Sequence, residues 1–335
     1  MVASVTRRQA IAGALAAVSA AVPAVLAATA TAQPVLPERS LRIFVGFATG
    51  GGADVVARAI APGLQMRTGR AVSVENRPGA SGADMGDWLK KAPPDGSVVG
   101  MMPSTTLLRR LTSPATFPFD PEIDLAALGI IGTFETAICA SPTTGARTLD
   151  EYMGWVKEAP SERRRFGTAA PDTFSQYFIQ LVARQYHVTL EPVAYRGTGP
   201  HSFDLAAGRI PAACGGLASF VHHHRGDRLR LLVTSGETRN PVLPDVPTIA
   251  ELGHPHLQLI DWYAFFAPAG LPSALIAAWN RDLVAAVQSP TVYEQLTQYG
   301  VVVAPTKPDA CAVRLAADLK RWRALLDLLG LHHSQ

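Results

Sequence analysis

The strongest constraint on the fold is a regular alternation of short apolar strands and helical segments that begins near residue 40. In the first helical segment Val56, Ala59, Ile60 and Leu64 recur at helical spacing, and Gly69 stands where that helix is expected to stop. Strands that alternate with helices in this way form parallel sheets with right-handed crossovers. The expected strands are residues 42–47, 71–74 and 98–102, and the expected helices are residues 53–67 and 84–91.

The alternation continues to the end of the chain, so we predict an α/β architecture throughout. The length of 335 residues is enough for two lobes, and no repeat or low-complexity segment interrupts residues 33–335. We therefore interpret the chain as two α/β lobes. The remaining expected strands are residues 125–140, 191–194, 229–234 and 261–266, and residues 165–167 are expected to lead into a short loop. The remaining expected helices are residues 149–159, 175–185, 202–207, 249–252, 273–288, 291–299 and 308–329.

Residues 1–32 have the composition of an export signal peptide. They contain no Asp or Glu, and Arg7 and Arg8 precede a run of apolar and small residues. This order of basic, apolar and small-residue regions predicts export to the periplasm, with cleavage near Ala30 or Ala32. The paired arginines favour a Tat signal, with an ordinary Sec signal as the alternative. An uncleaved membrane anchor is disfavoured because small alanines dominate the apolar run.

Removal of the signal peptide would bring the net charge of the chain close to zero. The whole chain has 30 Lys and Arg residues against 27 Asp and Glu residues, a net charge of +3. Loss of 32 residues that include Arg7 and Arg8 leaves 303 residues, with 28 basic against 27 acidic residues and a net charge of +1. A near-neutral chain lacks the basic surface that nucleic acid or an anionic membrane would bind, so we expect neither partner. We expect the mature protein to be soluble.

The cysteines and histidines do not form a recognisable metal site. Cys139, Cys214 and Cys311 are widely spaced, and we interpret them as small buried hydrophobic residues. One disulfide with one thiol left over is the alternative in an oxidising compartment. The triple histidine at residues 222–224 is a poor chelating set, because adjacent residues on a helix do not share a face. We expect no metal and no cofactor.

No set of residues predicts a reaction either. The chain has no complete nucleophile elbow, no cysteine in a catalytic context and no paired acid and base, so we expect that it is not an enzyme. Asp261 stands directly before Trp262 and Tyr263, where burial would raise the pKa of its carboxyl group. The alternative is a strand end in a hydrophobic wall.

Three loops of small residues follow predicted strands. They are residues 48–52, which contain Gly50, Gly51 and Gly52, and residues 166–173 and 195–200. Glycines let the backbone approach a ligand, and the N-terminus of the following helix offers unpaired N–H groups and a dipole that favour an anion. The first loop lacks the lysine of a P-loop and the spacing of a dinucleotide fingerprint. The three loops would converge on one cleft between two facing lobes, whereas each alone is equally compatible with a surface turn.

Several short motifs occur in one order along the chain and resemble a known family. They are GGGADVVAR at residues 50–58, ENRPGA at 75–80, PDG at 94–96, FPFDP at 117–121, YRG at 195–197, LPDVPTIAE at 243–251 and WYAFFAPAG at 262–270. The chain resembles the Bordetella uptake-gene (Bug) family, the extracytoplasmic solute receptors of tripartite tricarboxylate transporters. The resemblance extends from about residue 41 to residue 329, which is nearly the whole mature chain.

The resemblance implies a two-lobed periplasmic binding protein fold, similar to type II. Each lobe would be a mixed, mostly parallel sheet flanked by helices, with the ligand cleft between the lobes. Residues 33–137 would begin the first lobe, residues 138–234 would form the second lobe, and residues 235–335 would return to the first lobe and add the C-terminal helices. The implied function is capture of a small carboxylated organic solute and its delivery to membrane permease subunits, with the receptor acting as a monomer.

In such receptors two loops act as lips whose backbone N–H groups and small hydroxyls hold a carboxylate. The resemblance implies that residues 47–54 form the first lip. These residues are Phe47, Ala48, Thr49, Gly50, Gly51, Gly52, Ala53 and Asp54. The resemblance assigns the second lip, residues 168–173, to Thr168, Ala169, Ala170, Asp172 and Thr173, with Gln176 on the helix behind them. Ser81, Gly82, Ser104, Thr105, Tyr195, Gly197 and Thr198 would supply the remaining wall, and Asp261 completes the candidate ligand-binding set.

The sequence departs from the family pattern at both lips. Ala48 and Thr49 stand where family members usually carry prolines, and Ala170 and Asp172 stand where the second lip usually has glycines. Gln176 replaces a common histidine. An extra carboxylate at Asp172 would repel a second carboxylate of the ligand or attract an amine. We therefore hypothesise a non-standard ligand, such as a monocarboxylate or a carboxylate that also bears a cationic group.

Two other functions remain as alternatives to a transport receptor. One is a sensory binding protein that presents its ligand-bound form to a signalling partner. The other is an enzyme on the same fold, which the absence of a nucleophile, metal set or acid–base pair makes the weaker of the two. Ligand binding without turnover would exclude the enzyme.

Overall fold

The computed structural model describes residues 36–328 apart from residues 159 and 172. The predicted signal peptide and Asp172 of the second lip therefore lie outside the described residues. In chain order the elements are β1 (Leu41–Val45), α1 (Gly52–Thr68), β2 (Val72–Asn76), η1 (Ala80–Gly82), α2 (Ala83–Lys90), β3 (Val98–Pro103), α3 (Ser104–Thr112), η2 (Pro114–Thr116), β4 (Leu125–Ala140), η3 (Pro142–Thr144), α4 (Leu149–Lys157), η4 (Ser161–Arg164), β5 (Arg165–Thr168), α5 (Phe174–Gln185), β6 (Glu191–Ala194), α6 (Thr198–Ala206), β7 (Ala212–Gly216), η5 (Leu217–Ser219), α7 (Val221–Arg225), β8 (Arg230–Thr234), η6 (Pro255–Leu257), β9 (Ile260–Pro268), α8 (Ser273–Gln288), α9 (Pro290–Gln298), β10 (Val302–Val303) and α10 (Pro308–Leu328).

The described strands form one mixed sheet that is divided between two lobes. Its order is β2-β1-β3-β9-β4-β7-β5-β6, and β8 and β10 also pair with β4. The pairs β1–β2, β1–β3, β5–β6 and β5–β7 are parallel, whereas the pairs that involve β4 or β9 are antiparallel. We call the part that contains β1, β2 and β3 the first lobe and the part that contains β5, β6 and β7 the second lobe. The parallel arrangement predicted from the sequence is thus found in the outer strands of each lobe.

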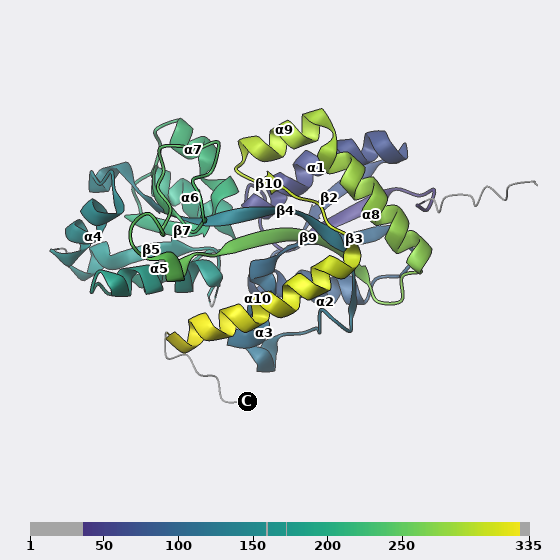
Figure 1. The fold of residues 1–335 in the computed structure, drawn as a ribbon, viewed down its shortest axis with the longest axis horizontal. Coiled ribbons are helices and arrows are strands. Elements are labelled where there is room, and N and C mark those ends of the chain that lie inside the picture. The colour runs from purple at the N-terminus through teal and green to yellow at the C-terminus, as the bar shows by residue number, and fades with distance from the viewer. Residues whose placement is uncertain (1–35, 159, 172, 329–335) are drawn as a thin grey trace, which may run out of the picture. The chain divides into compact units, whose positions relative to one another are not determined.

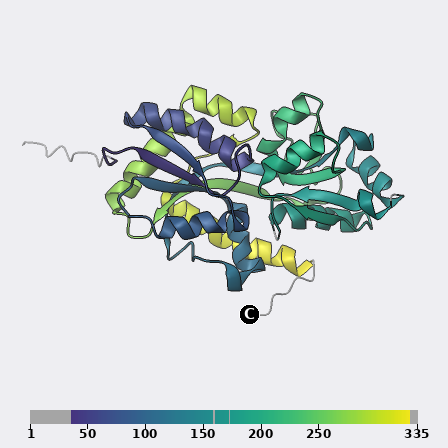
Figure 2. The ribbon, with the colours of Figure 1, turned by 180° about the vertical axis from the view of Figure 1, so that it is seen from behind.

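Strand β4 joins the two lobes. Its residues 125–135 pair with β9, and its residues 136–140 pair with β7. Figure 1 shows β4 and β9 running between the two lobes, and Figure 2 shows the same connection from behind. A continuous strand that takes part in both lobes places residues near its middle beside the boundary between them.

Both faces of the sheet in the first lobe are covered by helices, so its strands are buried on both sides. Alternate residues of β9 enter different cores, as the pleat of a strand requires. Trp262 and Phe266 pack into the core that includes side chains of α2, α3 and α10, and Tyr263 and Phe265 pack into the core that includes side chains of α1, α8 and α9. Figure 1 shows these two groups of helices on opposite sides of β4 and β9.

The structure differs from the sequence-based elements at a few places. The helices α3 and α7 and the strands β7 and β10 were not expected, and α6 begins at Thr198, four residues before the expected residue 202. The expected helix at residues 249–252 is wrong: this segment is a turn, held beside β8 by a bridge between Thr234 and Thr248. Strand β7 was missed because its sequence AACGG has low intrinsic strand propensity.

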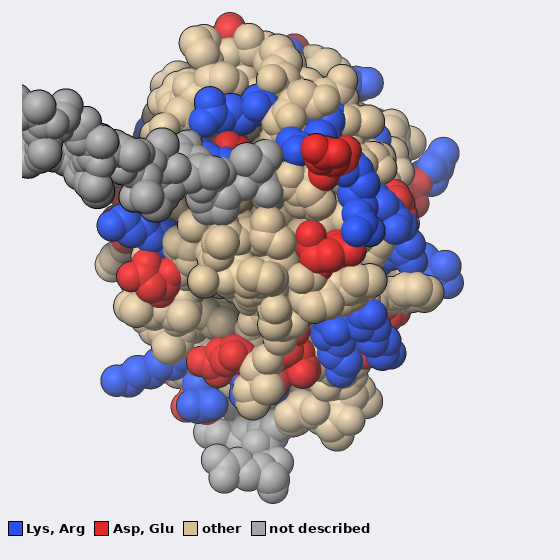
Figure 3. Space-filling view, turned by 90° about the vertical axis from the view of Figure 1, so that its right-hand side faces the viewer, with Lys and Arg blue, Asp and Glu red and all other residues tan. Residues whose placement is uncertain are grey.

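Two further expectations concern the cysteines and the surface. Cys139, Cys214 and Cys311 are all buried free thiols, as the interpretation of them as small hydrophobic residues predicts. On the face drawn in Figure 3 acidic and basic side chains are interspersed with uncharged surface. Among the described helices none is long and apolar enough to cross a membrane.

Candidate functional site

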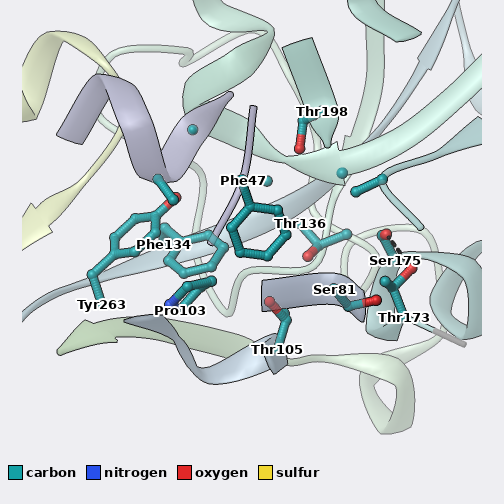
Figure 4. A pocket seen from close by; sticks show the side chains of 15 residues that line it. Phe47, Ser81, Pro103, Thr105, Phe134, Thr136, Thr173, Ser175, Thr198 and Tyr263 are labelled. Carbon is teal, nitrogen blue, oxygen red and sulfur yellow. Dashed lines mark hydrogen bonds between the residues drawn. The ribbon is translucent and has the colours of Figure 1, made fainter. Parts of the chain in front are cut away.

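A cavity lies where the first lobe, the second lobe and the crossing strand β4 meet. Its free volume is about 50 Å³, and fifteen residues line it. None of these side chains carries a charge at neutral pH, and many of them are small or hydroxylated. Figure 4 shows the cavity and the side chains that surround it. The lining residues are Phe47, Gly52, Ala53, Ser81, Pro103, Thr105, Phe134, Thr136, Ala169, Thr173, Ser175, Thr198, Gly215, Gly216 and Tyr263.

The starts of several helices converge on this cavity. Gly52 is the first residue of α1, Thr105 is the second residue of α3, Ser175 is the second residue of α5, and Thr198 is the first residue of α6. The first N–H groups of a helix have no partner inside the helix, and the helix dipole makes this end positive. Helix starts from both lobes therefore give the cavity a positive potential without a basic side chain, which suits a bound anion.

The walls of the cavity divide into an aromatic side and a hydroxyl side. Phe134 and Tyr263 stack with their ring centroids 4.2 Å apart, and Phe47 and Pro103 lie close to them (Figure 4). The hydroxyl groups of Ser81, Thr105, Thr136, Thr173, Ser175 and Thr198 occupy the other side in the same view. An anion with an apolar portion would find complementary surfaces on both sides.

The first lip is held in place by a buried carboxylate. Oδ2 of Asp54 accepts a hydrogen bond from the backbone N–H of Gly50 (2.9 Å), and Oδ1 accepts hydrogen bonds from Arg58 Nε (2.9 Å) and Asn76 Nδ2 (2.8 Å). Asn76 also donates through Nδ2 to the carbonyl oxygen of Phe47 at 3.0 Å. Asp54 therefore fixes the shape of the loop and does not line the cavity.

The second lip is held by hydroxyl groups. Oγ1 of Thr173 lies 2.8 Å from Thr168 Oγ1 and 3.1 Å from Ser175 Oγ, and it donates to the carbonyl oxygen of Ala170 at 3.1 Å. All three hydroxyl-bearing side chains are buried. Across the cleft Ser81 Oγ donates to the carbonyl oxygen of Pro171 at 3.4 Å, so a residue of the first lobe contacts the second lip directly.

The first lip also contacts the start of α6. A methyl group added at Gly199 would lie 3.1 Å from the carbonyl oxygen of Thr49 and 3.1 Å from the carbonyl carbon of Gly50. Gly197, just before α6, has a positive φ of 107° and donates its N–H to the carbonyl oxygen of Ala169 at 2.7 Å. The two lobes thus meet backbone to backbone here, which only small residues allow.

A larger cavity continues from the inner one toward the surface. It has a free volume of about 380 Å³ and shares Phe47, Ser81 and Ala169 with the inner cavity. Asp84 of the first lobe and Arg196 of the second lobe line this outer part. Charged side chains therefore stand at the mouth of the cleft, and uncharged ones surround its interior.

The sequence of this chain matches a known family of solute receptors. Residues 56–331 match the family model described as "Tripartite tricarboxylate transporter family receptor". The chain belongs to this family. Protein BugT of Bordetella pertussis is 28% identical to the receptor over 295 residues, which cover 88% of this chain and 90% of BugT.

Solved structures show the same fold. The periplasmic binding protein BugD aligns with a TM-score of 0.82 and 24% identity, over 89% of the receptor and 100% of BugD. MatC from Rhodopseudomonas palustris with bound malate aligns with a TM-score of 0.80 and 26% identity, over 87% of the receptor and 100% of MatC. The predicted family, the two-lobed α/β fold and the solute-receptor function are confirmed.

The candidate residues of the receptor fall into three groups by position. Those that line the inner cavity are Phe47, Gly52, Ala53, Ser81, Thr105, Ala169, Thr173 and Thr198, and those that line only the outer cavity are Ala170, Tyr195 and Gly197. Those that line neither cavity are Ala48, Thr49, Gly50, Gly51, Asp54, Gly82, Ser104, Thr168, Gln176 and Asp261. Several of the third group support residues of the first, as Thr168 supports Thr173.

Sequence reasoning missed seven residues of the inner cavity, which come from β3, β4, α5, β7 and β9. These are Pro103, Phe134, Thr136, Ser175, Gly215, Gly216 and Tyr263. Ser175 follows the second lip closely, and Tyr263 lies inside the motif at residues 262–270, although neither was named as a binding residue. No signal in the sequence indicated Phe134 or Thr136, because the boundary between the lobes falls inside the single long strand β4.

One titratable side chain lies just behind the cavity wall in the second lobe. His201 of α6 is fully buried between the rings of Tyr195 and Phe220, and neither ring nitrogen has a hydrogen-bond partner among the described residues. Burial lowers the pKa of His201 to about 3, so its ring is neutral at ordinary pH. His201 thus adds no positive charge to the cavity from behind.

The triple histidine lies elsewhere, on the short helix α7. His222 is exposed, His223 is buried and His224 is half-buried, so the three rings have different surroundings. Within residues 36–328, residues 159 and 172 excepted, no group of three His, Cys, Asp or Glu side chains is arranged to hold a metal ion.

Proposed function

We propose that the receptor binds a small carboxylate-bearing solute in the inner cavity and delivers it to the membrane permease subunits of a tripartite transporter. The convergence of helix N-termini from both lobes on a cavity without charged side chains carries this proposal. Fixed dipoles and hydroxyls attract an anion and still release it when the lobes separate. The malate bound in the related MatC structure is consistent with this ligand class.

We propose further that the ligand leaves unchanged and that the receptor is a monomer. The inner lining contains no His, Cys, Lys, Asp or Glu to act as nucleophile, acid or base. Mass spectrometry of a candidate ligand after incubation with the protein should therefore recover the ligand intact.

The lobe boundaries and the export route are part of the proposal. We place the first lobe at residues 33–137 and 235–335 and the second at residues 138–234, because β4 changes its partner from β9 to β7 at residue 136. Export to the periplasm agrees with the family, and the paired arginines favour the Tat route. The hypothesis of a monocarboxylate or a cationic carboxylate depends on Asp172, which lies outside the described residues, and it stays a prediction from the sequence.

A thermal-shift and calorimetry panel tests the ligand class. The panel contains mono-, di- and tricarboxylates, such as benzoate, malate, adipate and citrate, together with amino acids. A ligand at 100 times its Kd stabilises the folded state by about 2.7 kcal/mol, which is easily measured. We expect at least one carboxylate to raise the Tm, and no stabilisation by any member would contradict the proposal. Stabilisation by di- and tricarboxylates alone would reject the non-standard ligand.

The variant Gly52→Ala tests whether the stabilising carboxylate binds in the inner cavity. The added methyl group would lie 3.0 Å from the hydroxyl oxygen of Tyr263, which lines the cavity, and 3.3 Å from Ser219 Oγ, so it would crowd the cavity wall beside the start of α1. We expect it to weaken binding of the stabilising carboxylate. Gly154→Ala is the matched control, because a methyl group there has no heavy atom within 4 Å.

A further inference from the structure

A buried carboxyl group stands one side chain away from the inner cavity. Asp261 of β9 is fully buried and does not line the cavity. Its Oδ1 accepts a hydrogen bond from Ser104 Oγ (2.8 Å), and its Oδ2 accepts one from Thr136 Oγ1 (3.3 Å). Thr136 does line the cavity (Figure 4), so its hydroxyl lies between the carboxyl group and any bound ligand.

The hydroxyl of Thr136 has only one proton to donate, and the state of Asp261 decides where that proton points. An ionised carboxylate can only accept hydrogen bonds, so it takes the proton of Thr136 and leaves oxygen lone pairs toward the cavity. Those lone pairs would repel a ligand carboxylate. A protonated Asp261 can donate from Oδ2 to Thr136 Oγ1, which frees the threonine proton for the ligand.

The second partner of Asp261 cannot turn in the same way. Ser104 Oγ accepts the backbone N–H of Trp262 at 3.1 Å and donates to Oδ1 of Asp261. Ser104 lies behind the cavity wall, so its orientation does not affect the ligand. The proton of a neutral Asp261 is therefore expected on Oδ2, the oxygen that meets Thr136.

The surroundings of Asp261 make both protonation states accessible. Burial raises the pKa of Asp261 to about 7, and the carboxylate of Asp318 on α10 acts in the same direction. The hydrogen bonds from Ser104 and Thr136 and the charge of Arg314 act in the opposite direction. Tyr263 and Cys214, the other titratable groups that sense Asp261, have pKa values raised by burial and are neutral at pH 7.

The charged groups on α10 are already engaged with each other. Asp318 Oδ2 accepts hydrogen bonds from Trp262 Nε1 (2.7 Å) and Arg314 Nε (2.9 Å). No ion pair joins Asp261 to a basic side chain among the described residues. A proton is thus the available means of neutralising Asp261 when an anion enters the cavity.

We propose that the receptor takes up a proton together with its anionic ligand, and that Asp261 and Thr136 form the relay that couples the two events. This inference rests on the proposed binding of a carboxylate. The consequence is that affinity falls as the pH rises above neutrality, because the ionised receptor must first acquire the proton. By linkage the Kd would rise by at most about tenfold per pH unit in that range.

Titration calorimetry in buffers of different ionisation enthalpy counts the protons directly. The probe is the carboxylate of the panel that raises the Tm of the wild-type protein most. At pH 8 we expect uptake of up to about one proton per ligand bound. Binding heats that do not depend on the buffer would overturn the proposal and leave the binding function intact. If no carboxylate of the panel binds, that result would instead contradict the proposed function.

Two variants locate the relay. Asp261→Asn imitates the neutral acid, since its amide can donate to Thr136, so we expect no proton uptake and a Kd independent of pH. Thr136→Val keeps the shape and removes the hydroxyl, so we expect weaker binding below pH 7 and a smaller proton uptake. If Thr136→Val takes up as many protons as the wild type, Thr136 is not the relay and the proposal fails.

Glu135→Gln is the matched control for these variants. Glu135 is also a buried carboxyl group with a raised pKa on β4, but it accepts a hydrogen bond from Asn240 Nδ2 and does not line the cavity. We expect this variant to take up the same number of protons as the wild type. Loss of proton uptake in Glu135→Gln would show that Glu135, and not Asp261, couples proton uptake to ligand binding, and it would overturn the proposal.

A ligand-free measurement shows whether Asp261 itself titrates near neutrality. Its pKa in the folded protein, about 7, lies above the ordinary value of 3.8, so the folded protein binds this proton more tightly than the unfolded chain. The resulting stabilisation is present at low pH and is lost as the pH rises to 7. Asp261→Asn should remove this part of the pH dependence. Identical profiles for the variant and the wild type would contradict the proposed titration.

Discussion

The two lips of the cleft are held in place by different chemistry. In the first lip a single buried carboxylate, Asp54, collects hydrogen bonds from Gly50, Arg58 and Asn76. In the second lip Thr173 shares hydrogen bonds with neighbouring hydroxyls and with a backbone carbonyl, and no charged group takes part among the described residues. One lip is fixed by charge, and the other is fixed by groups that are both donor and acceptor.

This difference assigns different tasks to the lips. A carboxylate can only accept hydrogen bonds, and three donors hold that of Asp54, so the backbone of the first lip is kept in one arrangement. A hydroxyl proton rotates to suit its neighbours, so the second lip can present either a donor or an acceptor to the ligand. We therefore expect the first lip to determine stability and position, and the second lip to adapt to the ligand.

Asp54→Ala should have the largest effect, because it removes the centre of the first lip. The N–H of Gly50, the Asn76 amide and the guanidinium of Arg58 all lose an acceptor. Arg58 is about half exposed and keeps its hydration, so we expect a loss of roughly 2 kcal/mol in the free energy of unfolding and weaker ligand binding. Urea denaturation and calorimetry measure the two effects.

Asp84→Ala is the control for a carboxylate at the same cleft. Asp84 is exposed at the start of α2 and has no ion pair within the part of the chain that the structure describes. Surface substitutions of this kind usually change stability by less than about 0.5 kcal/mol. Equal losses for Asp54→Ala and Asp84→Ala would mean that the network of the first lip adds nothing specific.

Gly199→Ala tests the contact between the first lip and the second lobe. Gly199 does not have a positive φ, so the backbone accepts alanine, but the methyl group would lie 3.1 Å from atoms of Thr49 and Gly50. We expect about tenfold weaker ligand binding, near 1.4 kcal/mol, because the first lip must move away from α6. Gly154→Ala on the exposed surface of α4 should bind like the wild type. Unchanged affinity in Gly199→Ala would show that the lips do not need this approach.

The sequence predicted the lips better than it predicted the walls. Strand β4 was expected at residues 125–140 and is found there, because its apolar run has clear ends. The glycines at residues 50–52 indicated the first lip through their backbone freedom. These signals are local, so one segment of sequence is sufficient to read them.

The parts of the site that the sequence did not predict depend on contacts between segments that are far apart in the chain. Thr136 is an unremarkable residue in a long strand until β4 changes its partner there. The role of Asp54 depends on Asn76, which is 22 residues away, so the sequence could not show whether the carboxylate faced a ligand or its own loop. Asp261 was identified as a candidate from its aromatic neighbours. Its position behind the cavity wall depends on the pairing of β9 with β4, which the sequence does not show.

Thr173→Val should have the smallest effect, and it tests the adaptable lip. Valine keeps the shape of the side chain and removes the hydroxyl that contacts Thr168, Ser175 and the carbonyl oxygen of Ala170. Thr168 Oγ1 and Ser175 Oγ already lie 3.4 Å apart, so they can satisfy each other, and we expect a loss of about 1 kcal/mol in stability. Thr173→Ser, which retains the hydroxyl, should lose less. If Thr173→Val costs as much stability as Asp54→Ala, the second lip is as firmly fixed as the first, and adaptation to the ligand must come from movement of whole lobes.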